Sequence, residues 1–381
     1  MSAERAIDEE PEEEEPPPSG RPGPELVTDA EPDARRFVVA VVPGDDAAPE
    51  GMDAALSALA ALDPPVDWDV LPPGRELATV PMHEREQLVL GRLDAADTVL
   101  FGSTSGTTPG VVHLRWGRMT YANVRPIRWR PGFRSPLARP EGIDYVIVRE
   151  NLEDAYVGVM GDLADLRASG LVGPRARLAY EGEGRFAAKI ITRAGTEAVA
   201  RYAFELARSR RSHLTVSAKT NMLPRTDRYF CDVVDEVGTG YPDVTCERFI
   251  VDDMAHRLVM FPERFDVVLL PNLYGDVLSD EGAATIGGLG LAPSGCYGDD
   301  FAYFESIHGT APDLVGTGLI NPTGTLLSAV MMLSWLGLDD HSSRLDEAVG
   351  AVYARGERLT PDQGGTASAQ QFADAVVAAL T

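Results

Sequence analysis

The sequence predicts an α/β protein with a central sheet, because short apolar runs alternate with stretches of helical periodicity along its 381 residues. Short continuous apolar runs of this kind are typical of strands that are buried on both faces. The first run, residues 37–42, ends at Pro43-Gly44. A chain of this length can fold as one large domain or as two ordinary ones.

The individual elements follow from these patterns in chain order. A helix is expected after the first strand, and the next strand ends in the small-residue loop 102–106. The expected strands are residues 37–42, 98–101, 145–148, 214–217 and 265–270, and the expected helices are residues 54–62, 193–208 and 326–336. No Gly-x-Gly-x-x-Gly follows the first strand, so the Rossmann fingerprint is absent.

The charge of the chain argues against several classes of partner. Its formal net charge is -25, and residues 1–36 are rich in Glu, Asp and Pro, which predicts a disordered acidic tail. So acidic a surface repels phosphate backbones and anionic lipids, so neither nucleic acid nor a membrane is expected as a partner. A site for an anionic substrate must therefore concentrate arginine or a metal ion locally.

The cysteines and the apolar stretches indicate a cytoplasmic protein. Cys231, Cys246 and Cys296 show no Cys-x-x-Cys spacing and are expected to be reduced thiols. No uninterrupted apolar stretch is long enough to span a bilayer. The acidic start of the chain is unlike the basic start of a signal peptide.

Asp276 and Asp280 form the sharpest local pattern. They follow the run 265–270, and on a helix that begins near Gly275 they would lie four residues apart on one face. Two carboxylates at the carboxyl end of a strand suit a hard divalent cation. The helix dipole also favours aspartate near a helix N-terminus, without any metal.

Arg115, Arg125 and Arg149 form a second pattern, since each has apolar or small neighbours. Arg149 directly follows the run 145–148, so its guanidinium needs an anion, and a bidentate carboxylate is the natural one. Ordinary ion pairs would satisfy the three arginines equally well in so acidic a chain.

Two further segments carry residues with chemical potential. Lys219 lies just past the run 214–217 in a chain that is poor in lysine, and a partly desolvated lysine there can act as a base. A solvated loop lysine is the ordinary alternative. The Gly-, Thr- and Pro-rich loop 305–318 can wrap a nucleotide through its backbone, with Asp313 accepting from ribose hydroxyls. A plain surface loop has the same composition.

Together these segments resemble the isopropylmalate/isocitrate family of β-decarboxylating dehydrogenases, from about Arg115 to the C-terminus. Several independent motifs occur in the order and spacing typical of that family. They are Leu114-Arg115, Tyr121-Ala-Asn-Val-Arg-Pro126, Val148-Arg149-Glu-Asn151, Tyr156, Lys219-Thr-Asn, Val251-Asp252-Asp-Met-Ala, Tyr274-Gly-Asp276-Val-Leu-Ser-Asp280 and His308-Gly-Thr-Ala-Pro-Asp313.

The resemblance implies an isopropylmalate dehydrogenase-like fold with two α/β domains and a central sheet. Residues 37–120 and 287–381 would form a large cofactor-binding domain. Residues 121–286 would form a small domain with the substrate, metal and dimer contacts. The resemblance also implies a homodimer in which each active site is shared between the subunits.

The resemblance also implies a role for each site residue. Lys219, contributed by the other subunit, would take the hydroxyl proton of the substrate while hydride passes to NAD. A metal ion would stabilise the enolate left by the loss of CO₂, and Tyr156 would help to protonate it. The implied ligands of Mg²⁺ or Mn²⁺ are Asp252 (contributed by the other subunit), Asp276 and Asp280, the implied carboxylate clamp is Arg115, Arg125 and Arg149, and the implied cofactor-binding residues are Glu305, His308, Gly309, Ala311, Asp313 and Asn321.

Cofactor and substrate preference follow from single positions. NADP-preferring relatives carry Lys-Tyr where this chain has Asp313-Leu314, so NAD is expected. Val111 and Val112 would face the substituent on carbon three, and valines bury an alkyl group rather than a carboxylate. This favours 3-isopropylmalate or a related 3-substituted malate. Isocitrate, homoisocitrate, tartrate and D-malate stay open as alternatives. Arg149-Glu150-Asn151 resembles the isocitrate and homoisocitrate branch of the family, and Arg118 or His113 can turn inward and supply charge.

The sequence departs from the family pattern in two loops. Gly44-Asp45-Asp46-Ala47-Ala48-Pro49-Glu50 replaces the usual Gly-Asp-Gly-Ile-Gly-Pro-Glu, and Asn151-Leu-Glu-Asp154 replaces the usual Asn-Thr-Glu-Gly. These departures are compatible with a specialised-metabolism paralogue or, more remotely, with a non-catalytic regulatory subunit. The presence of Lys219, Tyr156 and all three metal aspartates favours an active enzyme.

Overall fold

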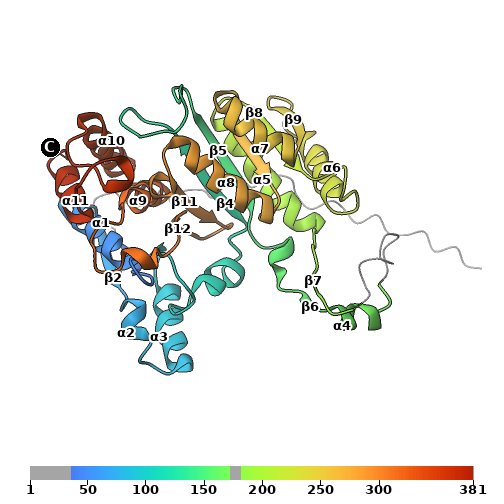
Figure 1. Ribbon diagram of the computed structural model, residues 1–381, viewed down its shortest axis with the longest axis horizontal. Coiled ribbons are helices and arrows are strands. Elements are labelled where there is room, and N and C mark those ends of the chain that lie inside the picture. The colour runs from blue at the N-terminus through green and yellow to red at the C-terminus, as the bar shows by residue number, and fades with distance from the viewer. Residues whose placement is uncertain (1–35, 172–181, 381) are drawn as a thin grey trace, which may run out of the picture.

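The structure, a computed structural model, describes residues 36–171 and 182–380. The predicted acidic tail lies outside the described residues except for Arg36. A mixed sheet of ten strands runs through this part of the chain (Figure 1). In spatial order the strands are β2 (Val66–Val70), β1 (Phe37–Val42), β3 (Thr98–Phe101), β12 (Ala302–Ser306), β11 (Pro293–Tyr297), β4 (Ala122–Arg128), β5 (Asp144–Glu150), β10 (Val267–Leu270), β8 (His213–Ala218) and β9 (Thr245–Ile250).

Two strands at the centre reverse the direction of the sheet. β11 and β4 run antiparallel to both of their neighbours, whereas all the other neighbouring pairs are parallel. The half from β2 to β12 comes from the two ends of the described chain, and the half from β4 to β9 comes from its middle. The predicted α/β class with a central sheet is therefore confirmed. The predicted division into two domains stays a prediction, because one continuous sheet passes through both.

Helices cover both faces of the sheet. Apolar residues of β5 alternate between two cores, one on each face of the sheet. Val146 and Val148 pack against one pair of helices, and Ile147 packs against a second pair. The first pair is α5 (Arg193–Ser209) and α6 (Asp227–Gly238), and the second is α7 (Val251–Met260) and α8 (Asn272–Ile286). The other half is covered by α1 (Ala48–Leu62), α2 (Gly74–Leu77), α3 (Met82–Ala95), α9 (Thr323–Trp335), α10 (Asp339–Arg355) and α11 (Ala369–Val377).

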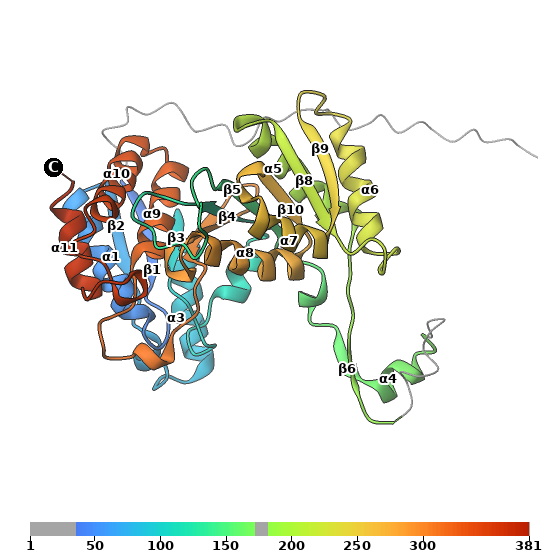
Figure 2. The ribbon, with the colours of Figure 1, turned by 45° about the horizontal axis from the view of Figure 1, so that its top comes forward.

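An arm projects from the half of the molecule that carries β8 and β9 (Figures 1 and 2). It consists of β6 (Met160–Asp162), α4 (Leu163–Ala168) and β7 (Arg185–Ala187), with β6 and β7 paired as a small antiparallel sheet. The arm exposes several apolar side chains, among them Val159, Met160 and Leu171.

Every strand and helix expected from the sequence is present; β1 and β3 have the expected ends, and the other elements have shifted ends. The helix expected at 54–62 begins at Ala48, and the strand expected at 265–270 begins at Val267. Arg149 lies within β5 and does not follow it. The helix expected near Gly275 begins at Asn272, because the carboxylate of Asp154 accepts from the first-turn Leu273 N–H at 3.1 Å.

Candidate active site

A row of polar residues crosses the middle of the sheet. Tyr303, Cys296, Asn123 and Arg149 lie directly opposite one another across β12, β11, β4 and β5. Residues directly opposite one another share a face of the sheet, and those two positions along each strand share it too. Arg125 therefore lies on this face, which is the face that α8 covers.

Arg149 binds the metal-ligand candidate Asp276. The Arg149 side chain is only 2% exposed, and its Nη1 donates to Asp276 Oδ1. Its Nε and Nη2 donate to Asn272 Oδ1 at 2.9 and 2.7 Å, which fixes the plane of the guanidinium. Burial, together with the nearby Arg125, lowers the pKa of Arg149 to about 10. The site therefore holds buried positive charge that one carboxylate only partly compensates.

Arg125 brings the second aspartate into the same group. Its Nη1 donates to Ser279 Oγ at 2.5 Å and lies 3.3 Å from Asp276 Oδ1 and 3.9 Å from Asp280 Oδ1. Burial raises the pKa of Asp280. Burial also acts to raise the pKa of Asp276, but Arg149, Tyr156 and Arg125 outweigh it and lower that pKa.

Tyr156 completes this group. It lies in the short helical turn Ala155–Val157, and its hydroxyl donates to Asp276 Oδ2 at 2.6 Å. The ring lies 5.3 Å from the Arg149 guanidinium. Burial and the carboxylate of Asp276 raise the pKa of Tyr156, so its hydroxyl keeps its proton at neutral pH.

Arg115 lies on a π-helical turn, His113–Gly117, and faces Glu305. The two side chains are half-buried, and Arg115 Nη2 lies 3.8 Å from Glu305 Oε1. The Nε of Arg115 is buried and has no hydrogen-bond partner among the described residues. Glu305, expected to bind the cofactor, therefore lies beside the arginine expected to bind the substrate.

Lys219 and Asp252 come together elsewhere on the chain. β8 and β9 are parallel neighbours, so the residues that follow them lie side by side, and Lys219 Nζ donates to Asp252 Oδ1. This contact lowers the pKa of Asp252, which is 66% exposed. Within residues 36–171 and 182–380, no three acidic, His or Cys side chains of one chain converge as a metal site. Asp276 and Asp280, four residues apart on α8, offer carboxylate oxygens of the kind that a hard cation binds, and two such residues alone do not make a complete ligand set.

The cofactor candidates lie on the loop that follows β12. Burial lowers the pKa of His308, and its Nε2 is buried without a partner in the described part of the chain. Asp313 and Gly309 are exposed, and Ala311 has a positive φ of 51°. The amide of Asn321 is already bonded to Asp362 and Tyr353, so a nucleotide would meet the backbone of this residue.

Several residues without a predicted role hold these loops in place. Glu50 accepts from Gly316 N and Gly318 N, both at 2.6 Å, and so clamps the cofactor loop. Asp45 is 4% exposed and accepts from the loop that follows β3, including Thr108 Oγ1 at 2.6 Å. Both residues belong to the departing segment Gly44–Glu50, in which the family's Asp and Glu are retained. These two retained residues were the feature of the sequence from which their structural role could have been predicted.

Val111 and Val112, which were expected to face the substituent on carbon three of the substrate, differ in exposure. Val112 is 65% exposed, whereas Val111 packs against the core beneath β1 and β3. His113 Nε2 and Arg118 Nη1 both bond to Asp94 of α3, at 2.7 and 3.3 Å. Neither basic side chain therefore turns inward beside Val112.

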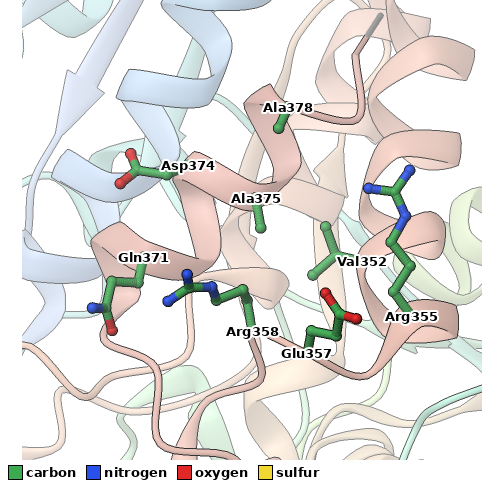
Figure 3. Close-up of a pocket in the computed structure, with 8 residues that line it drawn as sticks. All are labelled: Val352, Arg355, Glu357, Arg358, Gln371, Asp374, Ala375 and Ala378. Carbon is green, nitrogen blue, oxygen red and sulfur yellow. The ribbon is translucent and has the colours of Figure 1, made fainter.

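A separate hollow lies between α10 and α11 (Figure 3). It is lined by Arg355, Glu357, Arg358 and Asp374, among others, and contains none of the predicted site residues. Its acidic and basic side chains balance, so it does not select a charge. No helix among the described residues is both long and apolar enough to cross a membrane.

Comparisons with known proteins identify the family to which the chain is similar. Residues 38–376 match the family described as isocitrate/isopropylmalate dehydrogenase. An isocitrate/homoisocitrate dehydrogenase of Thermus thermophilus is 39% identical over 357 residues, covering 90% of this chain and 98% of the relative. A 3-isopropylmalate dehydrogenase of Archaeoglobus fulgidus is 36% identical over 344 residues, covering 90% and 99%. The isocitrate dehydrogenase structure from Methylococcus capsulatus superposes with a TM-score of 0.78 at 30% identity, covering 90% and 99%.

Proposed function

Because the chain belongs to the isocitrate/isopropylmalate dehydrogenase family, we propose that it oxidises and decarboxylates a 2-hydroxy-3-carboxy acid with NAD and Mg²⁺ or Mn²⁺. The best candidate substrate is 3-isopropylmalate or a related 3-substituted malate. The single observation that carries the proposal is the cluster of Arg125, Arg149 and Tyr156 around Asp276. Buried arginines beside an ionised aspartate suit a substrate carboxylate next to a cation.

The donor set fits the two groups that this chemistry needs. Asp276 and Asp280 offer oxygen ligands from one subunit. Asp252 is exposed, so in a dimer Asp252 of one subunit would complete the ligand set of the other. The unpaired His308 Nε2 and the clamped loop beside it fit a nucleotide. When bound, the cation supplies Lewis acidity at the substrate's hydroxyl oxygen and NAD supplies a hydride acceptor.

The side chains of the site have separate roles in binding the substrate and in moving protons. Arg115, Arg125 and Arg149 hold the carboxylates and so orient the bond that breaks. Lys219 accepts the proton of the hydroxyl group, and Tyr156 donates its phenolic proton to the carbon that loses CO₂. The hydrogen bond from Tyr156 to Asp276 supports this role, because the phenolic proton lies beside a proposed metal ligand.

The separation of the two half-sites within one chain supports a homodimer. Lys219 and Asp252 pair with each other and do not join Asp276 and Asp280 in one chain. The apolar side chains of Val259, Met260 and Val277 are exposed on α7 and α8. A second copy packed on these helices would bury them and bring the two half-sites together.

Three features support the cofactor, substrate and compartment assignments. Exposed Asp313 can accept from a ribose 2′-hydroxyl and would repel a 2′-phosphate. Val112 has no basic neighbour turned toward it, since His113 and Arg118 bond to Asp94, so an alkyl substituent suits this position better than a carboxylate. The three cysteines are free thiols, which fits the cytoplasm.

The test is a turnover assay with 3-isopropylmalate, isocitrate, homoisocitrate, tartrate and D-malate, each with NAD or NADP and Mn²⁺. The highest kcat/KM is expected with 3-isopropylmalate and NAD, and EDTA should abolish activity. Asp276→Asn is the matched control, because it removes one anionic ligand and should abolish turnover without unfolding the chain. A preference for isocitrate, equal use of NADP, or full activity in EDTA would each contradict the corresponding part.

A further inference from the structure

Lys189 and Lys219 are the only two lysines in the sequence, and every other basic residue apart from histidine is an arginine. Both contact one buried carboxylate. Asp227, the first residue of α6, accepts from the backbone N–H of Lys219 at 2.8 Å and lies 2.8 Å from Lys189 Nζ. Lys219 has an expected role as the base, whereas Lys189 has none.

The ammonium of Lys189 lies between two aspartates that are fully buried. Its Nζ is 2.8 Å from Asp227 Oδ1 and 3.4 Å from Asp154 Oδ2, and both aspartates are 0% exposed. The ring of Tyr274, on α8, lies 4.3 Å away on a further side. A compact ammonium can approach two carboxylates and an aromatic face at once, whereas a planar guanidinium is restricted to its own plane.

Each of these aspartates fixes a segment of the proposed active site. Asp154 accepts from Leu273 N at 3.1 Å, at the start of the helix that carries Asp276, and from Ala155 N at 2.7 Å, next to Tyr156. Asp227 fixes the backbone of Lys219. Lys189 therefore connects the segment of the metal ligands and the acid with the segment of the base.

The backbone of Asp154 indicates that this carboxylate is needed. Its φ is 67°, a conformation that favours glycine and strains a residue with a side chain. The chain holds an aspartate there despite the strain. The compensating contacts are its hydrogen bond from Leu273 N of α8 and its ion pair with Lys189.

We propose that Lys189 is a positioning residue that holds the Tyr156–α8 segment and the Lys219 segment in a fixed relation through Asp154 and Asp227. The inference rests on the proposed function. In the proposed dimer these two segments serve different active sites, so one ammonium braces part of each. Loss of the ammonium leaves two buried carboxylates without their shared counter-ion, and both segments move.

The test compares Lys189→Met, Lys189→Arg and Asp154→Gly by hydrogen exchange of the free protein and by steady-state kinetics. Lys189→Met should accelerate exchange at both the Lys219 and Leu273 amides by about tenfold or more. It should lower kcat by about tenfold to a hundredfold while KM for the hydroxy acid stays within about twofold, since the arginine clamp is untouched. Lys189→Arg should restore part of both losses.

Asp154→Gly keeps the test decisive if Lys189→Met does not fold, because glycine suits the backbone at this position. It should accelerate exchange at Leu273 and leave Lys219 protected. Arg193→Met, which removes an exposed ion pair on α5, is the control and should change neither amide. Unchanged exchange at both amides in Lys189→Met overturns the inference. A wild-type chain inactive on every acid overturns the proposed function, while the exchange data still decide the inference.

Discussion

Glu150 at the end of β5 is a buried carboxyl group beside the site, and it titrates unusually. It is 1% exposed, and burial raises its pKa to about 7. The backbone N–H groups of Leu152 and Glu153 donate to its two oxygens at 2.7 and 2.9 Å, which opposes this shift without cancelling it. The loop that leads to Asp154 and Tyr156 is thus hydrogen-bonded to a carboxyl group whose protonation changes near neutral pH.

Glu150→Gln should change how stability depends on pH. In the unfolded chain the carboxyl group loses its proton near pH 4.5, whereas in the folded chain it keeps it to about pH 7. Rising pH across this window therefore stabilises the unfolded state, by up to about 3 kcal/mol. Relative to wild type, Glu150→Gln should gain stability between pH 4.5 and 7 and no more above it. Urea unfolding at several pH values measures this, and a constant difference would exclude the titration of Glu150.

At the same scale, the sequence indicated the residues proposed to take part in the chemistry, but not the residues that position them. Arg149 follows an apolar run, so its need for an anion could be predicted, and the structure brings it to Asp276. Lys189 and Asp227 are neighbours only through the fold, and no local pattern distinguishes them from surface residues. Asp154 was noticed as a departure from a motif, but its partner on α8 lies over a hundred residues away.

The close approach of α8 to β5 depends on one residue at the scale of the element. Gly275 lies in α8, and a Cβ there would be 2.6 Å from Cβ and 2.7 Å from Cγ of Arg149. Those side-chain atoms cannot yield, because the guanidinium of Arg149 is fixed by Asn272. The helix would have to move instead, and Asp276 would move with it.

Gly275→Ala should lower the free energy of unfolding by about 1–3 kcal/mol and lower kcat as well. Gly91, in the middle of α3, is the matched control, since a Cβ there meets nothing within 4 Å. Gly91→Ala should raise the free energy of unfolding by up to about 1 kcal/mol, because alanine favours the helix. Thermal and urea unfolding compare the two variants. Equal effects would show that the contact between α8 and β5 is not tight.

Three of the strands that form the polar row at the site were not predicted from the sequence. β1 and β3 are uninterrupted apolar runs, and their ends were predicted correctly. β4, β11 and β12 were not predicted, because residues such as Asn123, Arg125 and Glu305 interrupt their apolar pattern. The function that places polar groups on these strands also removes the periodicity by which they could be recognised.

At the scale of the whole molecule, activity should depend on association of two chains. Met260, at the end of α7, is 55% exposed and lies on the face proposed for dimerisation. Met260→Glu should convert the dimer to a monomer, because it buries two uncompensated charges at the interface. Activity should fall with it, since each half-site would lack its complement.

Sedimentation velocity and turnover measured over a range of protein concentrations test this prediction. Val70→Glu is the control, because Val70 is 45% exposed on the edge strand β2, away from α7 and α8. It should stay dimeric and active. A monomeric wild-type chain with full turnover would contradict the shared site.

The unbroken sheet also has a mechanical consequence. The two halves are joined at its centre by the pairing of β11 with β4, where Gly295, Cys296 and Tyr297 lie opposite Val124, Asn123 and Ala122. Hydrogen-bonded strands, and not a flexible linker, join the halves at this point. Closing the halves around a ligand would therefore twist the pairing of β11 with β4 and deform it elastically. The deformation would be greatest while the substrate is enclosed, and its release would favour reopening when the product leaves.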